Sequence, residues 1–294
     1  MIMKSPFVAI VTSILVLISC SKNNEILNST DVENVDSELV LESFTSEISD
    51  MLISVLRNVN DTQLGSTGTI PDLGSMDSRL TGAIITVSGE GGIDNPHGVI
   101  TINFGKGTID PAGVVRKDSL TITYSGRRWA VGSSRIVSFK SYWRNSVVFD
   151  DNMTYSTTNL SPDSTATTLN FHHALVGGKL TFPDQTSILT DAEFNAEINF
   201  VAKTTTISAS GLTHSATGTM RTGAGFVMDI TTPIIYKESC IASKVFIPVE
   251  GEKSMTIGGA TYKINYGDGT VCDNTVTVIV GEKSTNITVH SDGN

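Results

Sequence analysis

The feature that most constrains the fold is a long series of short apolar–polar alternations that begins at Thr81 and continues toward the carboxyl end. Ile84–Val87, Val99–Phe104 and Leu120–Tyr124 are typical runs, and Gly, Asp, Asn or Pro separate them. Alternation puts apolar side chains on one face of a strand and polar ones on the other. The short connections favour antiparallel hairpins rather than a parallel α/β sheet. We therefore predict a mainly β fold over residues 80–294, an antiparallel β-sandwich or an elongated β-sheet in one or two subdomains.

One segment ahead of this series has a helical pattern instead. Over residues 35–60, apolar side chains such as Val40, Phe44 and Val55 recur three or four positions apart, which predicts an amphipathic helix. Acidic residues lie in its first turns and Arg57 lies in its last, as the helix dipole favours. Such a helix could pack on the β domain of its own chain or bind a partner.

The amino terminus has the layout of an export signal. Lys4 provides a positive charge, and a mostly apolar run extends from Phe7 to Ile18. This run is shorter than the roughly 20 residues that a membrane-spanning helix needs. We therefore interpret residues 1–19 as a signal peptide that is removed on export.

The end of this signal resembles a bacterial lipobox, because Leu17, Ile18 and the small residue Ser19 precede Cys20. In a lipobox the Cys thiol receives acyl chains such as palmitate, and two or three chains together anchor a protein stably. An ordinary signal peptide that happens to precede a Cys is the alternative. Residues 20–34 are polar and predict a lipidated tether. An acidic signal for inner-membrane retention is missing after Cys20, so we expect a lipoprotein of the outer membrane, held in the cell envelope.

Charge is distributed unevenly along the chain. The whole protein carries a net charge of −10 with a pI of about 4.9, which argues against nucleic-acid binding. Residues 106–144, in contrast, hold eight basic and two acidic side chains, a local net charge of +6. Arginine binds carboxylate and phosphate in fork geometry, and two Trp residues lie among these cations.

Two interpretations of this basic run stay open. It could form a surface for an anionic glycan or a lipid headgroup, or its charges could line the wet faces of strands and pair with acids elsewhere. Alternation sends neighbouring side chains to opposite faces, so a run in sequence need not be a patch in space. The candidate anion-binding or glycan-binding residues are Arg116, Lys117, Arg127, Arg128, Trp129, Arg135 and Arg144.

Two cysteines, Cys240 and Cys272, follow Cys20 in the chain. Disulfides persist in exported proteins, so the two could form a bridge, or they could remain separate buried thiols. The oxygen-rich loop that contains Asp268 and Asp273 is a weak Ca²⁺ candidate, although Asp and Gly also suit tight turns. We find no zinc-ligand spacing, no cofactor motif and no catalytic motif, so we expect no metal, no cofactor and no enzymatic activity.

Several turn-rich phrases occur in the β region, namely Phe104–Gly107, Tyr124–Arg127, Tyr266–Thr270 and Cys272–Asn274. With their surroundings they cover about a third of the mature chain, and they resemble phrases of Bacteroidota envelope lipoproteins. The resemblance implies an envelope location and a β fold. Relatives often carry a further Cys where this chain has Thr108–Asp110, so the resemblance implies no disulfide scheme.

These observations together predict a lipid-anchored envelope protein whose β domain binds a surface ligand or partner, such as an anionic glycan or another envelope protein, without catalysis. A structural fimbrial or adhesin-like subunit is the first alternative, with the segment Val35–Val59 removed or exchanged. A hydrolase of glycans or lipids with unrecognised carboxylates is the second.

Overall fold

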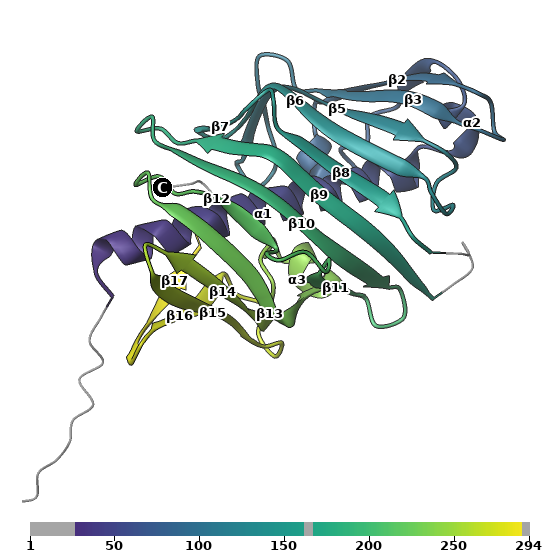
Figure 1. Cartoon of the computed structure of the whole chain (residues 1–294). Helices are drawn as coiled ribbons and strands as arrows, with labels where there is room; N and C mark the ends of the chain where they lie inside the picture. Colours follow the sequence, from purple (N-terminus) through teal and green to yellow (C-terminus); the bar gives the residue numbers. More distant parts are fainter. Residues whose placement is uncertain (1–26, 162–166, 290–294) are drawn as a thin grey trace, which may run out of the picture.

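The computed structural model describes residues 27–161 and 167–289, so the predicted signal peptide and Cys20 lie outside the described residues. One long helix lies against the concave side of a single antiparallel sheet (Figure 1). The helices are α1 (Ser29–Asn58), α2 (Asp61–Leu64), the 3-10 helix η1 (Ser78–Leu80) and α3 (Glu238–Ala242). The strands are β1 (Gly68–Ile70), β2 (Ile84–Glu90), β3 (His97–Asn103), β4 (Thr108–Ile109), β5 (Val115–Ser125), β6 (Ser134–Arg144), β7 (Val147–Phe149), β8 (Thr154–Asn159), β9 (Thr168–Thr181), β10 (Ser187–Asn199), β11 (Thr204–Ala209), β12 (Ala216–Thr219), β13 (Gly225–Lys237), β14 (Glu250–Ile257), β15 (Ala260–Asp268), β16 (Thr275–Val280) and β17 (Lys283–Thr288).

The strands follow one another as an antiparallel meander. The order of the main strands is β1, β2, β3, β5, β6, β8, β9, β10, β13, β14, β15, β16 and β17, while β4 pairs with β5 and β7 pairs with β6 and β9. Both β11 and β12 pair with β10 on one side and with β13 on the other. The sheet is therefore interrupted between β11 and β12, over residues 210–215, next to the cavity described below.

Helix α1 is the centre of the core rather than an element on its surface. Leu39, Val40 and Leu41 are consecutive and all buried, although successive helical residues point in directions about 100° apart. A helix that buries apolar residues in several directions must be covered in several directions. Figure 1 shows how the sheet achieves this: β8, β9 and β10 cross one side of α1, and β14–β17 bend round toward another.

The helix begins earlier than the sequence predicts. The Asn28 side chain accepts a hydrogen bond from the backbone N–H of Asp31 at 2.9 Å, which is N-cap geometry. Residues 29–34, predicted to belong to a polar tether, therefore form the first turns of α1. Asn34 is buried and accepts a hydrogen bond from Thr222 of the β12–β13 turn, a contact across 188 positions that no local pattern reveals.

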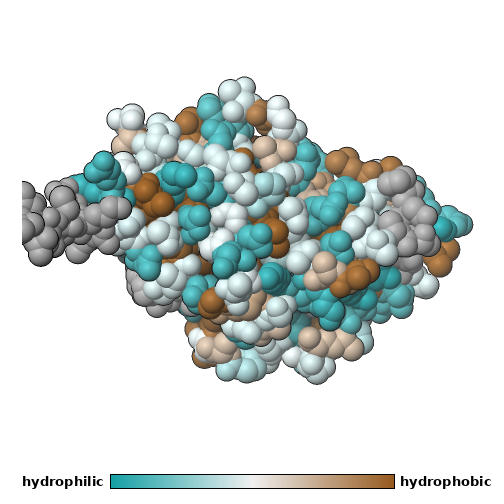
Figure 2. Space-filling model, turned by 90° about the horizontal axis from the view of Figure 1, so that it is seen from below, coloured by the Kyte–Doolittle hydropathy of each residue, from teal (hydrophilic) through white to brown (hydrophobic). Residues whose placement is uncertain are grey.

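The predicted fold class is confirmed: the chain is mainly antiparallel β with one long amino-terminal helix. The sheet is a single curved one instead of two packed layers, because α1 fills the space that a second sheet would occupy. On the face shown in Figure 2, hydrophobic residues are scattered in small spots between hydrophilic ones. The candidate site described below lies between α1 and the sheet.

Candidate ligand cavity between helix and sheet

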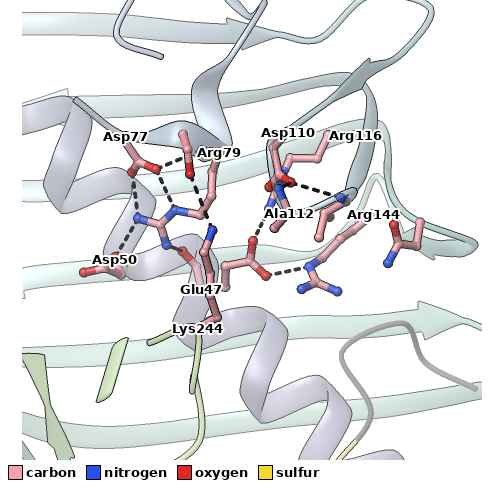
Figure 3. Close-up of polar contacts among 12 residues, drawn as sticks. Glu47, Asp50, Asp77, Arg79, Asp110, Ala112, Arg116, Arg144 and Lys244 are labelled. Carbon is pink, nitrogen blue, oxygen red and sulfur yellow. Dashed lines mark hydrogen bonds and ion pairs between the residues drawn. The ribbon is translucent and has the colours of Figure 1, made fainter. Parts of the chain in front are cut away.

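One part of the helix–sheet interface is closed by ion pairs and aromatic rings. Glu47 on α1 lies between two sheet arginines (Figure 3), with one carboxylate oxygen on Arg116 and the other 2.5 Å from Nε of Arg144. Asp110 also contacts Arg116, at 2.8 Å. Burial alone would lower the pKa of Arg116, but Glu47, Tyr142 and Asp110 raise it, so this guanidinium stays charged.

A second buried arginine beside this group holds the loop before β2 against α1. Arg79 of η1 contacts Asp77 at 2.7 Å and Asp50 of α1 at 2.6 Å (Figure 3). Aromatic side chains fill the space under β5, β6 and β7, where the rings of Phe139 and Phe149 lie 5.0 Å apart. Every buried charge in this part of the core therefore has an opposite charge in contact with it.

Farther toward the beginning of α1, the charges are balanced differently. Glu42 accepts hydrogen bonds from Lys253 at 2.5 Å and from Tyr266 at 2.6 Å, while Glu38 lies 3.5 Å from the same Lys253. Two carboxylates thus share one cation. Glu38 is 4% exposed, and its Oε2 has no hydrogen-bond partner among residues 27–161 and 167–289. Burial raises the pKa of Glu38 to about 7, with Lys253 opposing the rise and Glu42 adding to it.

A cavity opens between α1 and the sheet, beside Glu38 and Lys253. The volume open to the centres of water-sized molecules inside it is about 170 Å³. A single water requires roughly 10–15 Å³ by the same measure. The lining is mainly apolar and comes from α1, α3, strand β6 with the loop before it, and strands β8–β14. Its apolar members include Leu41, Leu52, Ile53, Leu56, Leu175, Ala192, Phe194, Ala196, Ile198, Ile207, Ala216, Met228, Ile230, Ile234 and Ile241.

Side chains on two sides of the cavity are only half-buried, which gives the cavity a mouth. On α1 these are Thr45, Ser46 and Ser49, and on the sheet they include Phe194 and Ile207. The α1 residues lie on one stripe of the helix, since Ser49 follows Thr45 by four positions and Ser46 by three. Small side chains along this stripe leave the space that larger residues fill elsewhere along the helix.

The end of the cavity near the last turns of α1 is polar. Arg135 of β6 lines it, is 7% exposed, and stacks on the ring of Trp129, with the guanidinium carbon 4.9 Å from the ring centroid. Arg135 forms no ion pair or side-chain hydrogen bond with any other described residue. Burial, and then the nearby charge of Arg128, lower the pKa of Arg135 to about 10, so it remains a cation at neutral pH.

His173 of β9 lies on the same polar end. Its ring stacks between Tyr155 and Phe194, with centroid distances of 5.4 Å and 5.2 Å, and its Nδ1 lies 2.7 Å from the Tyr155 hydroxyl. Burial, followed by the neighbouring His172 and Arg135, lowers the pKa of His173 to about 3. His173 is therefore neutral and does not offset a charge on its neighbours.

The seven predicted anion-binding residues do not form one surface patch. Arg116 and Arg144 are each 2% exposed and belong to the Glu47 ion pairs, while Arg135 and Trp129 lie in the cavity. The alternative prediction, that the charges line wet strand faces and pair with acids elsewhere, is wrong about the wet faces for these arginines, because their side chains point inward. It is confirmed in its second part for Arg116 and Arg144, which pair with the remote acid Glu47 of α1.

The remaining basic residues of the predicted set take separate places. Arg127 is exposed and pairs with Asp94 at 2.8 Å. Arg128 donates to the carbonyl oxygens of Leu56 and Arg57, so it caps the carboxyl end of α1, where the helix dipole favours a cation. Lys117 lies over the ring of Trp143, 5.6 Å from its centroid.

Two further predictions concern the loops near the carboxyl end. Cys240 of α3 and Cys272 form the disulfide that was one of the two predicted states. Asp268 and Asp273 each accept a hydrogen bond from a backbone N–H two residues ahead, of Thr270 and Thr275, which is a turn role. Throughout the described ranges, no group of three or more His, Cys, Asp or Glu side chains is placed to hold a metal ion.

Comparison with known proteins adds no relative to this geometry. No family model, no curated protein and no solved structure matches the chain. Within residues 27–161 and 167–289, no helix has both the length and the apolar character needed to cross a membrane.

The sequence analysis selected Arg135 and Trp129 but missed the cavity and its other polar residues, among them Glu38 and His173. One signal was available, since Thr45, Ser46 and Ser49 interrupt the apolar pattern of α1 on one stripe. A helix that is otherwise apolar in several directions keeps such a stripe only where it does not meet close-packed neighbours.

Proposed function

We propose that the protein is a lipid-anchored envelope protein whose β domain binds an apolar or amphiphilic molecule in the cavity between α1 and the sheet. The observation that supports this function is the cavity itself, with its mainly apolar lining, its half-buried mouth and a few polar groups at its ends. Ligand sites in proteins generally combine these properties. Well-packed cores, in contrast, leave few voids larger than a water molecule.

The arrangement of the lining supports binding of an apolar molecule. Phe194, Ile207 and Ile230 supply apolar contact surface. Burial of apolar ligand surface contributes about 25 cal/mol per Å² removed from water, so an alkyl chain gains affinity with each enclosed methylene. The sequence analysis predicted a non-enzymatic envelope binder with a basic surface as its binding site. We propose instead that the binding site is the cavity on the concave side of the sheet.

A titration with N-phenyl-1-naphthylamine, a neutral apolar dye whose fluorescence rises away from water, tests the proposal. The protein is the full chain with Cys20→Ser, which keeps every described residue and carries no acyl group. We expect saturable binding of one dye molecule per chain. Thr205→Trp should weaken it by tenfold or more, because Thr205 lines the cavity and a Trp there would occupy much of the space.

The neighbouring residue provides a matched control. Thr206 lies between two cavity-lining residues of β11, Thr205 and Ile207, so its side chain points to the opposite face of the sheet. Thr206→Trp should therefore bind the dye as the parent chain does. Equal binding by both Trp variants, or no saturable binding by the parent, would contradict the proposed function.

The lipid anchor is tested separately. Cells that express the wild-type chain and are fed a labelled fatty acid should incorporate the label into the protein, whereas the Cys20→Ser chain should remain unlabelled. The chemical reason is that acylation at a lipobox requires the thiol of the Cys. Equal labelling of the two chains would reject Cys20 as the attachment point.

A further inference from the structure

Arg135 points to the chemistry of the ligand. On β6, Arg135, Val137 and Phe139 alternate with more exposed residues and face the concave side of the sheet. A guanidinium in that position is removed from water, which is unfavourable unless an opposite charge or good hydrogen bonds compensate. The other buried arginines have this compensation: Arg116 and Arg144 contact Glu47, and Arg79 contacts Asp50 and Asp77.

The surroundings of Arg135 leave its charge uncompensated. Trp129 supports one face of the guanidinium at 4.9 Å, and a cation–π contact of this kind does not replace a counter-ion. His173 is neutral, and Arg128 carries the same sign as Arg135. Among the described residues, Arg135 therefore has five N–H donors and no carboxylate that accepts from them.

The backbone of Trp129 shows that this end of the cavity is built and held. Its φ is 67°, in the left-handed region that a bulky residue rarely adopts. The buried side chain of Asn159 donates to the backbone oxygens of Trp129 and Ala130, the second at 3.1 Å, and so holds the turn. Strained residues that are fixed by neighbours in this way are concentrated at binding sites.

We propose that Arg135 binds the anionic headgroup of an amphiphile, a carboxylate or a phosphate monoester, while the alkyl chain occupies the apolar cavity. The inference rests on the proposed function and adds the class of ligand. Both headgroups present two oxygen atoms to a guanidinium fork. The chain would then extend from Arg135 along α1 past Leu52 and Phe194, which line the cavity.

Competition against N-phenyl-1-naphthylamine on the Cys20→Ser chain tests the headgroup. The competitors are dodecanoate, dodecyl phosphate and dodecanol, which share a chain length and differ in the polar end. We expect the two anions to bind about tenfold to hundredfold more tightly than dodecanol, as a charge-assisted hydrogen bond predicts. The comparison of dodecanoate with dodecyl phosphate tells which of the two headgroups the site prefers.

Arg135→Met and Arg127→Met remove the same charge at two places. Arg127 is a surface residue with a side chain 52% exposed, so its variant is the matched control. Arg135→Met should abolish the preference for the anions, while Arg127→Met should keep it. Arg135→Met should also raise the melting temperature of the ligand-free chain by about 2–4 °C, because a buried cation without a partner is removed.

The outcomes separate the two proposals. If dye and dodecanol bind but the anions show no preference, the headgroup inference fails and the cavity function stands. If no alkyl compound and no dye binds, both fail together. An Arg135→Met chain that melts below the parent and keeps the preference for anions would show that Arg135 is only structural, which overturns the inference.

Discussion

The two halves of the helix–sheet interface place their charges in opposite ways. In the packed half, around Glu47 and Phe149, one carboxylate meets two arginines and aromatic rings fill the remaining space. In the cavity half, around Glu38 and Arg135, two carboxylates share one lysine and an arginine has no acid in contact with it among the described residues. One half is arranged for stability, whereas the other leaves polar groups and space that a ligand can use.

Glu47→Gln should produce one of the two largest losses of stability, because it breaks the ion pairs that Glu47 makes with the buried Arg116 and Arg144. Removal of one partner from a buried ion pair lowers the free energy of unfolding by about 3–5 kcal/mol. Urea unfolding followed by circular dichroism measures this. Arg127→Met, which breaks an exposed pair, should change the free energy of unfolding by less than about 1 kcal/mol. Similar losses for the two variants would remove the distinction between buried and exposed pairs.

Phenylalanine truncations in the two halves should differ in effect. Phe149 is fully buried, so Phe149→Ala should lower the free energy of unfolding by about 3–5 kcal/mol. Phe194 borders a space that is already open and is half-buried, so Phe194→Ala should lower it by only about 1–2 kcal/mol. The same urea titration measures the loss of free energy of unfolding for each variant. Equal losses would mean that the two halves are packed alike.

The pH dependence of Glu38 should reveal the excess of carboxylates in the cavity half. Its pKa is about 7 in the folded chain and 4.5 in its ordinary state, so the fold favours the protonated form. The stability that this group contributes is complete below pH 4.5 and is lost as the pH rises through 7. Glu38→Gln cannot ionise, so its free energy of unfolding should rise relative to wild type by about 3 kcal/mol over that range.

The difference in the free energy of unfolding between Glu38→Gln and wild type isolates Glu38, because the contributions of the other titrating groups cancel. Because the pKa of His173 is near 3 in the folded chain, the free energy of unfolding falls as the pH drops below 6.5. His173 is present in both chains, so its contribution cancels in the difference. Thermal unfolding at several pH values between 4 and 8 gives the difference directly. A difference that does not vary with pH would show that Glu38 has the same pKa in the folded and the unfolded chain.

The local structure could be predicted from the sequence, whereas the packing could not. Strands such as β2 and β3 were readable because one face is buried and the other is wet, and the helical periodicity of α1 was equally plain. Local alternation carries no information on how far a sheet curves, so a sandwich and a single wrapped sheet could not be distinguished.

The site was less predictable than the fold for a related reason. Glu47 and Arg144 are 97 positions apart, and nothing in either segment marks the other as its partner. The basic run suggested an anion site, but only the direction of each side chain separates Arg135, in the cavity, from Arg127, at the surface. Which cation lacks a partner is a property of the folded chain.

Photo-crosslinking can show whether a ligand enters between α1 and the sheet. A dodecanoate analogue with a terminal diazirine is irradiated with the Cys20→Ser chain, and the modified peptides are mapped by mass spectrometry. We expect adducts on cavity-lining residues such as Phe194, Ile207 and Met228, and we expect excess dodecanoate to suppress them. Adducts confined to the outer face of the sheet, at positions such as Thr206, or adducts that dodecanoate does not suppress, would contradict entry between α1 and the sheet.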